Sequence, residues 1–468
     1  MIALTLEEIA DATDGSVHGE PGTVVTGEPF LDSRAVVPGG LFVAMTGEHV
    51  DGHAYAGTAH AAGAAAVLAE RPTDAPTVVV ADPEVALGRL ARHVLDRLPD
   101  VTVLALTGSQ GKTGTKDYLA AILSDAGPTV ATLGNLNNEL GVPLTVLRAT
   151  ADTAYLVVEM GARHEGNIAY LCTIARPRVA AVLNVGSAHL GEFGSREAIA
   201  RTKGEIVEAL PADGTAVLPG WPDPWLDGLA DRTNARVLSF GWPTADVFAD
   251  QAEDDDLMRM SFLLHHGGDV APVRLHQVGA HQMINATAAA AMAVAVGVPV
   301  PAAAAALTAA RPASRWRMEV HERADGVTVI NDAYNANPDS MVAALDTLHR
   351  IGRRGRRTIA VLGAMRELGE RHDAEHRSVG ATASAARVDA LVVVGDEARG
   401  IADGARGADG WAGALVVTAG RDEALTWLRN NVLPGDVVLV KASRGVALEH
   451  VADGLLADAP RPEGEPLA

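Results

Sequence analysis

The sequence predicts an α/β protein built from three domains. The chain has 468 residues, which is more than a single hydrophobic core usually contains. From residue 101 onward, apolar strand-like runs alternate with helix-like runs, a pattern typical of doubly wound, largely parallel sheets. We expect a small α/β domain over 1–98, a central domain over 99–312, a C-terminal domain over 313–458, and a disordered Pro/Glu-rich tail over 459–468.

Composition and charge restrict the class of protein. The formal net charge is −21, which argues against a nucleic-acid partner and requires that any anionic ligand be held by locally placed Lys and Arg side chains. The one cysteine, Cys172, excludes an internal disulfide and fits a reducing cytoplasm; we expect a small core residue. The first residues carry no basic segment, so no signal peptide is expected. These features favour a cytoplasmic protein, which we expect to be monomeric.

One uncharged run, residues 286–310, is long enough to span a bilayer. It consists mostly of alanine, and Gly297, Pro299 and Pro301 interrupt it. Because these residues end helices and form turns, we expect two buried helices and no membrane span.

The first domain contains short strand-like and helix-like segments and a polar cluster, Asp32-Ser33-Arg34. A Ser-Arg pair at the end of a strand can bind a phosphate or a base edge. Arginines in loops are more often solvated, so the pattern alone favours the solvated interpretation. The residues of the first domain by themselves do not indicate a particular chemical reaction.

A glycine-rich turn at the start of the central domain predicts a P-loop. It joins the apolar run 101–106 to a helix-patterned run, 115–124, and it comprises Thr107, Gly108, Ser109, Gln110, Gly111, Lys112 and Thr113. Backbone N–H groups and the helix N-terminus can bind phosphate there, with Lys112 on a terminal phosphate and Thr113 on Mg²⁺. The strict pattern has glycine where Leu106 lies, and a tight βα turn is the alternative. We interpret the segment as a nucleotide site.

Other polar residues follow strand-like runs, where ligands gather on parallel sheets. Glu159 follows 154–158, which suits a Mg²⁺ site, and His189 follows 179–183, where a structural histidine is the alternative. Lys203 lies on the next helix, where a surface lysine is the usual interpretation.

Two further segments of the central domain leave alternatives open. Asn137 and Asn138 lie in a turn-rich loop whose amides contact substrate or cap the next helix. His281 and Asn285 share one helix face and contact an adenine or cap that helix. Residues 244–278 predict an antiparallel appendage, with a solvated acidic turn at 253–256.

The last third predicts a second doubly wound, Rossmann-like domain. Strand-like runs at 327–330, 358–362, 390–394, 415–418 and 437–440 alternate with helix-like runs. The first run ends in a polar segment that contains Asp332, Asn335 and Asn337, which is a ligand-facing position. Lys441, Ser443 and Arg444 follow the last run and suit a carboxylate or phosphate, the alternative being a helix N-terminus without function. The arginines at 353–357 are interpreted as solvated.

Taken in order, these segments resemble the Mur ligases of peptidoglycan synthesis over nearly the whole chain. The segments that carry the resemblance are 32–34 with 38–44, 107–113, 134–143, 158–162, 188–194, 203–205, 317–319 and 331–338. The family's order of functional residues is kept by Lys112, Glu159, His189, Lys203, Asn285, Arg317 and Asp332.

The resemblance implies an ATP-dependent, ADP-forming amide ligase of cell-wall precursor synthesis, needed for cell shape and division. ATP phosphorylates a carboxylate, and an amine then attacks the acyl phosphate. The match is to the branch that adds D-alanyl-D-alanine to UDP-N-acetylmuramoyl-tripeptide. By resemblance, Thr113, Glu159, His189 and a carbamylated Lys203 hold Mg²⁺, and the catalytic residues are Lys112, Lys203, His189, Arg317 and Asp332.

The resemblance also distributes the ligands over the domains. The phosphate turn, His281, Asn285, Arg317 and Asp332 would bind ATP. The first domain would bind the UDP end through Ser33 and Arg34. The remaining substrate contacts would come from Asn137, Asn138, Asn335, Asn337, Lys441, Ser443 and Arg444. Because the ATP residues lie on two domains, domain closure would complete the site and exclude water.

Some positions depart from the family pattern and leave open a paralogue with another acceptor: the segment 219–224, Ala364 and Gly445. A ligase that adds a diamino acid lacks support, since its Asp-Asn-Pro acceptor motif is missing. No guanine motif indicates a GTPase, and no Gly-x-Gly-x-x-Gly turn indicates a dinucleotide-binding protein. A non-catalytic scaffold predicts losses at Lys112, Lys203 or Asp332, and all three are present. The third residue of the peptide, diaminopimelate or lysine, stays open.

Overall fold

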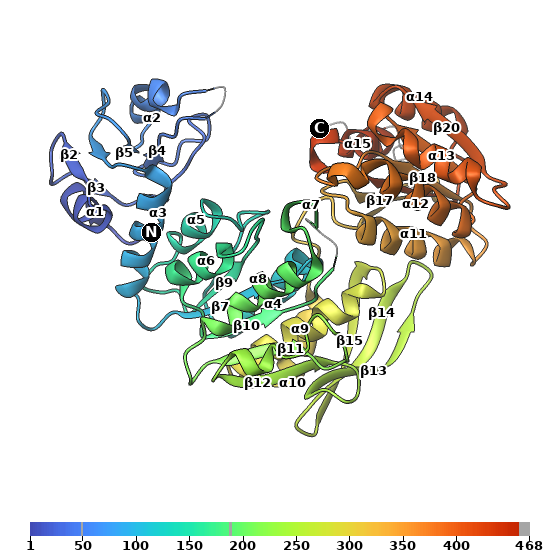
Figure 1. The fold of residues 1–468 in the computed structure, drawn as a ribbon, viewed down its shortest axis with the longest axis horizontal. Coiled ribbons are helices and arrows are strands. Elements are labelled where there is room, and N and C mark those ends of the chain that lie inside the picture. Colours follow the sequence, from blue (N-terminus) through green and yellow to red (C-terminus); the bar gives the residue numbers. More distant parts are fainter. Residues whose placement is uncertain (48–49, 187–189, 458–468) are drawn as a thin grey trace.

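The computed structural model describes residues 1–47, 50–186 and 190–457 and divides them into three α/β domains. Figure 1 shows the central domain between the first and the last. The predicted fold class is therefore confirmed, whereas the domain boundaries at 98/99 and 312/313 stay predictions. The tail over 459–468 lies outside the described residues.

The first domain is a four-stranded sheet with a small two-stranded ribbon beside it. Its elements are β1 (Leu4–Thr5), α1 (Leu6–Thr13), β2 (Ser16–His18), β3 (Val24–Val25), β4 (Leu41–Val43), η1 (Gly52–Tyr55), α2 (Ala56–Ala61), β5 (Ala66–Ala69), β6 (Thr77–Val79) and α3 (Pro83–Asp96). Helix α1 begins at a capping box in which Thr5 and Glu8 satisfy each other's backbone N–H groups. Helix α3 contributes Leu90 and Val94 to a core that also contains residues of the central domain, so the two domains share apolar packing.

The central domain has one nine-stranded sheet in the order β15-β14-β13-β12-β11-β10-β7-β9-β8, parallel from β8 to β13. Its strands are β7 (Thr102–Thr107), β8 (Thr129–Ala131), β9 (Tyr155–Glu159), β10 (Val179–Val182), β11 (Thr215–Pro219), β12 (Arg236–Gly241), β13 (Val247–Asp254), β14 (Arg259–His266) and β15 (Asp269–Val278). Its helices are α4 (Lys112–Ala126), α5 (Gly141–Val146), α6 (Asn167–Ala175), α7 (Leu190–Phe193), α8 (Arg196–Glu208), η2 (Ala230–Arg232), α9 (His281–Ala295) and α10 (Val300–Ala309).

Alternate residues of β7 pack into different cores. Val103 and Ala105 belong to the core shared with the first domain, and Leu104 and Leu106 to the core beneath α4 and α9. A strand that is apolar on both faces is typical of a parallel sheet covered by helices on each side. This packing fixes the carboxyl end of β7, where the phosphate turn begins.

The alanine-rich run forms two helices, α9 and α10, as predicted, with Gly297 at φ 90° between them. Both helices pack in the core on one face of the central sheet. Among the residues that the structure describes, no helix has the length and apolarity that crossing a membrane requires.

The predicted appendage is confirmed as the antiparallel strands β13, β14 and β15, but its acidic turn is not simply solvated. Asp254 and Asp256 lie 3.1 and 3.0 Å from the Arg354 guanidinium of the third domain. Beside them, Leu257 and Met258 are buried in the hydrophobic core of that domain. The appendage is therefore a contact between two domains.

The third domain has a six-stranded sheet in the order β16-β17-β21-β18-β19-β20, antiparallel only at β16. Its strands are β16 (Glu319–Glu322), β17 (Thr328–Asp332), β18 (Thr358–Leu362), β19 (Ala390–Val394), β20 (Ala414–Thr418) and β21 (Val437–Lys441). Its helices are α11 (Pro338–Gly352), η3 (Gly369–Arg371), α12 (His372–Ala385), η4 (Asp396–Ala398), α13 (Arg399–Gly407), α14 (Arg421–Asn431), η5 (Arg444–Val446) and α15 (Glu449–Ala457).

Three of the arginines interpreted as solvated have partners: Arg354 contacts the central domain as described above, and Arg356 and Arg357 fix the amino ends of these strands. Arg356 donates to the carbonyls of Gly435 and Gly326 at 2.8 and 2.9 Å, and Arg357 contacts Asp436 at 3.1 Å. The interpretation was wrong because carbonyls from two segments distant in sequence meet here.

Candidate functional site

A cavity of about 1160 Å³ is lined by residues of both the central and the third domain. It collects most of the residues that the sequence singled out. Those that line it are Ser109, Gln110, Gly111, Lys112, Thr113, Asn137, Asn138, Glu159, Lys203, His281, Asn285, Arg317, Asp332, Asn335, Asn337, Lys441, Ser443 and Arg444. The carboxyl ends of β7, β9, β17 and β21 all face this cavity, as expected for ligand sites on parallel sheets.

The phosphate turn is held open by a neighbouring strand end. Asn184, which follows β10, accepts from the Gln110 N–H at 3.0 Å and donates to its carbonyl at 3.1 Å. Gly111 precedes α4 with φ 77°, and Asn285 lies where a side chain at this position would be. Glycine is required there on both grounds. The first N–H groups of α4 thus face the cavity without helical partners.

Lys112 folds back over this turn and donates to the Gly108 carbonyl at 2.7 Å. Burial lowers the pKa of Lys112, the Glu159 carboxylate opposes that shift, and the Arg317 guanidinium adds to it. Arg317, on the third domain, is therefore close enough to influence a residue of the phosphate turn. Among the described residues the Gly108 carbonyl is the hydrogen-bond partner of Lys112, and a lysine held by a carbonyl can turn to a phosphate when one binds.

Glu159 is the acidic group of the cavity that best fits a cation. It is 1% exposed; its Oε1 accepts from Asn137 at 2.7 Å, whereas Oε2 is buried without a hydrogen-bond partner among the described residues. A buried carboxylate oxygen without a partner is costly unless a ligand satisfies it. With the Thr113 hydroxyl, it fits Mg²⁺, which takes few carboxylates and fills its shell with phosphate oxygens and water.

Nothing in the described part of the chain offers a metal site made of protein ligands alone: no three His, Cys, Asp or Glu side chains gather there. His189, which the resemblance assigns to metal binding, lies outside the described residues.

Lys203 is not the surface lysine that its sequence context suggests. It lies on α8, is 7% exposed, and lines the cavity. Burial lowers the pKa of Lys203 well below its usual range, and the nearby Lys112 charge adds to the shift. The side chain is therefore a neutral amine at a pH where an exposed lysine is charged.

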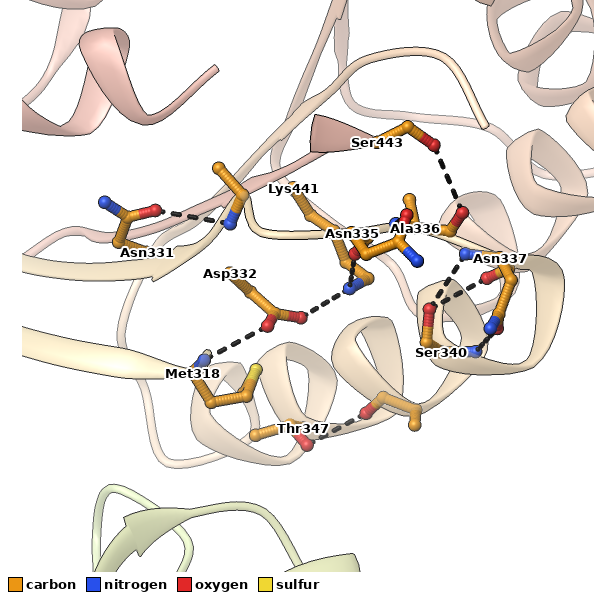
Figure 2. A network of polar contacts seen from close by, with 12 residues as sticks. Met318, Asn331, Asp332, Asn335, Ala336, Asn337, Ser340, Thr347, Lys441 and Ser443 are labelled. Atoms are coloured by element: carbon orange, nitrogen blue, oxygen red, sulfur yellow. Dashed lines mark hydrogen bonds and ion pairs between the residues drawn. The ribbon is translucent and has the colours of Figure 1, made fainter. Parts of the chain in front are cut away.

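The third domain presents a buried ion pair to the cavity (Figure 2). Asp332 and Lys441 end the adjacent parallel strands β17 and β21 in register, and their side chains lie 2.6 Å apart. Lys441 also donates to the Asn335 carbonyl at 2.9 Å, and Asp332 accepts from the Met318 N–H at 3.1 Å. One lysine thus holds together two strand ends and the loop that follows β17.

Arg317 lies in the segment that connects the central and third domains. Its guanidinium carbon lies 4.0 Å from the centre of the Tyr334 ring, a cation–π contact, and its Nε is buried without a partner among the described residues. The Trp316 carbonyl accepts from the Tyr334 N–H at 3.1 Å. The connecting segment is therefore fixed against the loop after β17, and Arg317 is oriented by it.

Some predicted residues have other partners. Asn337 caps α11 through the Ser340 N–H, and Arg444 pairs with Glu449 and stacks on Trp316. Thr107 is buried, and neither it nor Gly108 lines the cavity. Ser33 and Arg34 also lie away from the cavity; Arg34 is 88% exposed and contacts Asp32 at 2.8 Å.

Three residues of the site were not predicted from the sequence: Tyr334, Asn184 and Arg366. Tyr334 orients Arg317, Asn184 braces the phosphate turn, and Arg366 lines the cavity. Each follows a strand by a few residues, so a stricter use of the strand-end rule would have found all three.

Three family models match the chain. One described as "Mur ligase family, catalytic domain" matches residues 30–99, "Mur ligase middle domain" matches 106–293, and "Mur ligase, glutamate ligase domain" matches 316–444. A relative from Mycobacterium tuberculosis, named UDP-N-acetylmuramoyl-tripeptide–D-alanyl-D-alanine ligase, is 47% identical over 98% of both chains.

Solved structures agree with these matches. MurF from Acinetobacter baumannii superimposes with a TM-score of 0.87 at 35% identity, over 97% of this chain and 99% of that one. MurF ligase from Thermotoga maritima, solved in complex with ADP, gives a TM-score of 0.79 at 32% identity, over 93% and 98% of the two chains.

Proposed function

The chain belongs to the Mur ligase family, and we propose that it joins D-alanyl-D-alanine to UDP-N-acetylmuramoyl-tripeptide with conversion of ATP to ADP and phosphate. The reaction forms one amide bond in two steps. A carboxylate oxygen of the tripeptide takes the γ-phosphoryl group and ADP leaves. The dipeptide amine then attacks the acyl carbon, phosphate leaves, and the amine nitrogen loses a proton.

One observation carries the proposal: a single cavity joins a phosphate-binding turn on the central domain to polar strand ends on the third domain. A ligase that uses an acyl phosphate needs this arrangement, because the activated carboxylate must meet the amine before water does. Movement of the third domain onto the central one would shorten the path between the two ligands and exclude water.

The residues around the phosphate turn act by binding and orientation. The N–H groups at the start of α4 bind phosphate oxygens, and Lys112 moves from the Gly108 carbonyl to the transferring phosphoryl group. Thr113 and the free oxygen of Glu159 would hold Mg²⁺. Bound there, the ion would supply positive charge to the phosphate oxygens. Arg317, Asp332, His281 and Asn285 complete the ATP site from both sides of the cavity.

Carbamylation of Lys203 is part of the proposal. The lone pair of a neutral Nζ adds to the carbon of CO₂, a carbamate forms, and one proton is released. A buried lysine with a lowered pKa supplies that neutral amine at a lower pH than an exposed lysine does. The product is an anionic oxygen ligand, which a hard cation accepts; the resemblance implies His189 as a further ligand.

The other two ligands are assigned by domain. Asn335, Asn337, Lys441, Ser443 and Arg444 bound the part of the cavity that belongs to the third domain, which we assign to the dipeptide together with Asn137 and Asn138. Ser33 and Arg34 are assigned to the UDP end. Location in the cytoplasm and a monomeric state stay predictions from the sequence.

The test is phosphate release from ATP in the presence of the UDP-linked tripeptide, with and without D-alanyl-D-alanine, and a mass measurement on the product. Tripeptides that end in meso-diaminopimelate and in lysine are both assayed. We expect release that depends on the dipeptide and a product heavier by one dipeptide less one water. Phosphate release only with a different amine would refute the assignment of D-alanyl-D-alanine as acceptor. No turnover with any amine would refute the assignment as a ligase.

A further inference from the structure

We infer that Arg366 binds the carboxylate of the acceptor dipeptide and so sets the enzyme's preference for an acceptor with a free C-terminus. This inference rests on the proposed function. Arg366 follows β18 by four residues and lines the cavity from the third domain. Its backbone N–H donates to Ser443 Oγ at 2.9 Å, and Ser443 in turn contacts the Ala336 carbonyl at 3.3 Å. Three loops that follow β17, β18 and β21 are thereby joined around it.

Lys441 and Arg444, two other cations on this side of the cavity, already have partners, and a third, Arg317, is assigned to ATP. Lys441 is 2% exposed and holds Asp332 and the Asn335 carbonyl. Arg444 is paired with Glu449 and stacked on Trp316. Each of these charges is neutralised by a near or buried group, so an incoming carboxylate gains little from either one.

The Arg366 guanidinium is different. Its ionic contact within the described part of the chain is a distance of 3.7 Å to Glu397, and the two side chains are 51% and 64% exposed. A solvated pair at that distance contributes little. The guanidinium can therefore turn to a carboxylate and bind it through two parallel hydrogen bonds.

Gly445 gives this side chain its place. A Cβ built on Gly445 would overlap Nη1 of Arg366 and lie 2.9 Å from its Cζ. The backbone of Gly445 is not in the left-handed region, so a larger residue there conflicts only with the present position of the Arg366 guanidinium, which would have to move aside. The glycine at 445, a departure from the family pattern, is thus compatible with this position of the arginine, and any larger residue would displace the guanidinium.

The chemistry of the acceptor fits this position. A free dipeptide is a zwitterion whose amine must reach the acyl phosphate, beside Lys112 on the central domain. Its carboxylate then extends toward the third domain, where Arg366 lies. An arginine at that end distinguishes a free dipeptide from one whose C-terminus is blocked.

The experiment compares D-alanyl-D-alanine with its C-terminal amide as acceptors for the wild type, R366Q and R366K. We expect R366Q to raise the KM for the dipeptide about 10- to 100-fold, the loss expected for a charge-assisted bidentate contact, and to leave the KM for the amide within about threefold. The KM for ATP and for the tripeptide should stay unchanged. R366K keeps the positive charge but cannot form two parallel hydrogen bonds, so its KM for the dipeptide should lie between those of the wild type and R366Q.

Two further variants make the result specific. R163Q removes an arginine that lines the same cavity from the central domain and contacts Glu367 at 3.7 Å, and we expect it to leave the preference for the free carboxylate intact. G445A displaces the guanidinium without removing it, so it should raise the dipeptide KM in the wild type and have no further effect in R366Q.

Three outcomes would overturn the inference: equal effects of R366Q on dipeptide and amide, no effect of R366Q on either, or loss of the preference in R163Q instead. These outcomes leave the ligase intact, because the wild type still turns over D-alanyl-D-alanine. A wild type that turns over only another amine would refute the proposed function itself, and the inference with it.

Discussion

Replacing Lys441 with methionine tests whether one buried lysine holds the acceptor side of the cavity together. The Nζ of Lys441 lies 2.6 Å from Asp332 and 2.9 Å from the Asn335 carbonyl, and the side chain is almost fully buried (Figure 2). Methionine keeps the length and removes the charge. The variant therefore leaves the Asp332 carboxylate in place without its cation.

The expected loss follows from the surroundings of Asp332. Breaking a buried pair by removing one partner costs about 3–5 kcal/mol. In the variant, Asp332 still accepts a hydrogen bond from the Met318 N–H and still lines the cavity. We therefore expect a loss of stability at the lower end of this range, about 3 kcal/mol. For a domain of about 150 residues, that corresponds to a fall of roughly 6–12 °C in the unfolding midpoint.

Calorimetry that resolves the transition of the third domain is the assay, with the double variant K441M/D332N measured alongside. Because neither partner is then left charged and alone, the double variant should lose less than the sum of the single losses, by about 2 kcal/mol. R350Q is the control, since it breaks an exposed pair with Asp346 on α11 and should cost under about 1 kcal/mol. A loss in K441M no larger than in R350Q, or additive losses in the cycle, would refute the reasoning.

Three other predictions concern single contacts. E159Q should raise the Mg²⁺ concentration for half-maximal turnover about 10-fold and yet stabilise the fold by about 1 kcal/mol, because a neutral amide replaces a buried carboxylate whose Oε2 has no hydrogen-bond partner among the described residues; Mg²⁺ titrations and urea unfolding check both, and a destabilised E159Q would contradict the second. For Lys203, the folded pKa lies below the unfolded one, so the unfolded chain binds more protons and stability falls as pH falls from 10.5 toward the folded pKa. K203M should remove this dependence of the unfolding free energy on pH, which is up to about 1.4 kcal/mol per pH unit, as measured by urea unfolding in CO₂-free buffer. The same pH dependence in K203M and in the wild type would refute the prediction. R354A should weaken the contact with Asp254 and Asp256 by about 1 kcal/mol, and calorimetry should then show separate transitions for the central and third domains. Addition of 1 M salt should separate the transitions of the wild type in the same way and should not change those of R354A.

The phosphate turn shows what can be predicted from sequence. An apolar run, a glycine-rich turn and a helical run are contiguous, and the structure has β7 and α4 on either side of the turn. The same holds for the strand ends that carry Glu159 and Asp332, since parallel strands bring their carboxyl ends to one edge of the sheet. The N-cap of α11 is also predictable from the sequence, because Asn337 precedes a proline at the first helical position.

Other features depend on segments that are distant in the chain. Lys203 shares one helix face with Ile199, Ile206 and Val207, so the spacing alone places it on the apolar side of α8, but only the packing of that face shows how deeply it is buried. Asp254 and Asp256 look like a solvated turn until the third domain brings Arg354 to them. Arg366 and Gly445 lie after different strands, and only the folded structure shows that they are in contact.

By itself, the sequence determined the three-domain α/β class, the phosphate turn and the strand ends that line the cavity, because periodicity and turn chemistry act over a few neighbouring residues. Tertiary structure alone decided which charges are buried, which are already paired, and which remain available to a ligand. Those properties depend on desolvation and on partners from other segments, and neither is encoded in any local stretch of the chain.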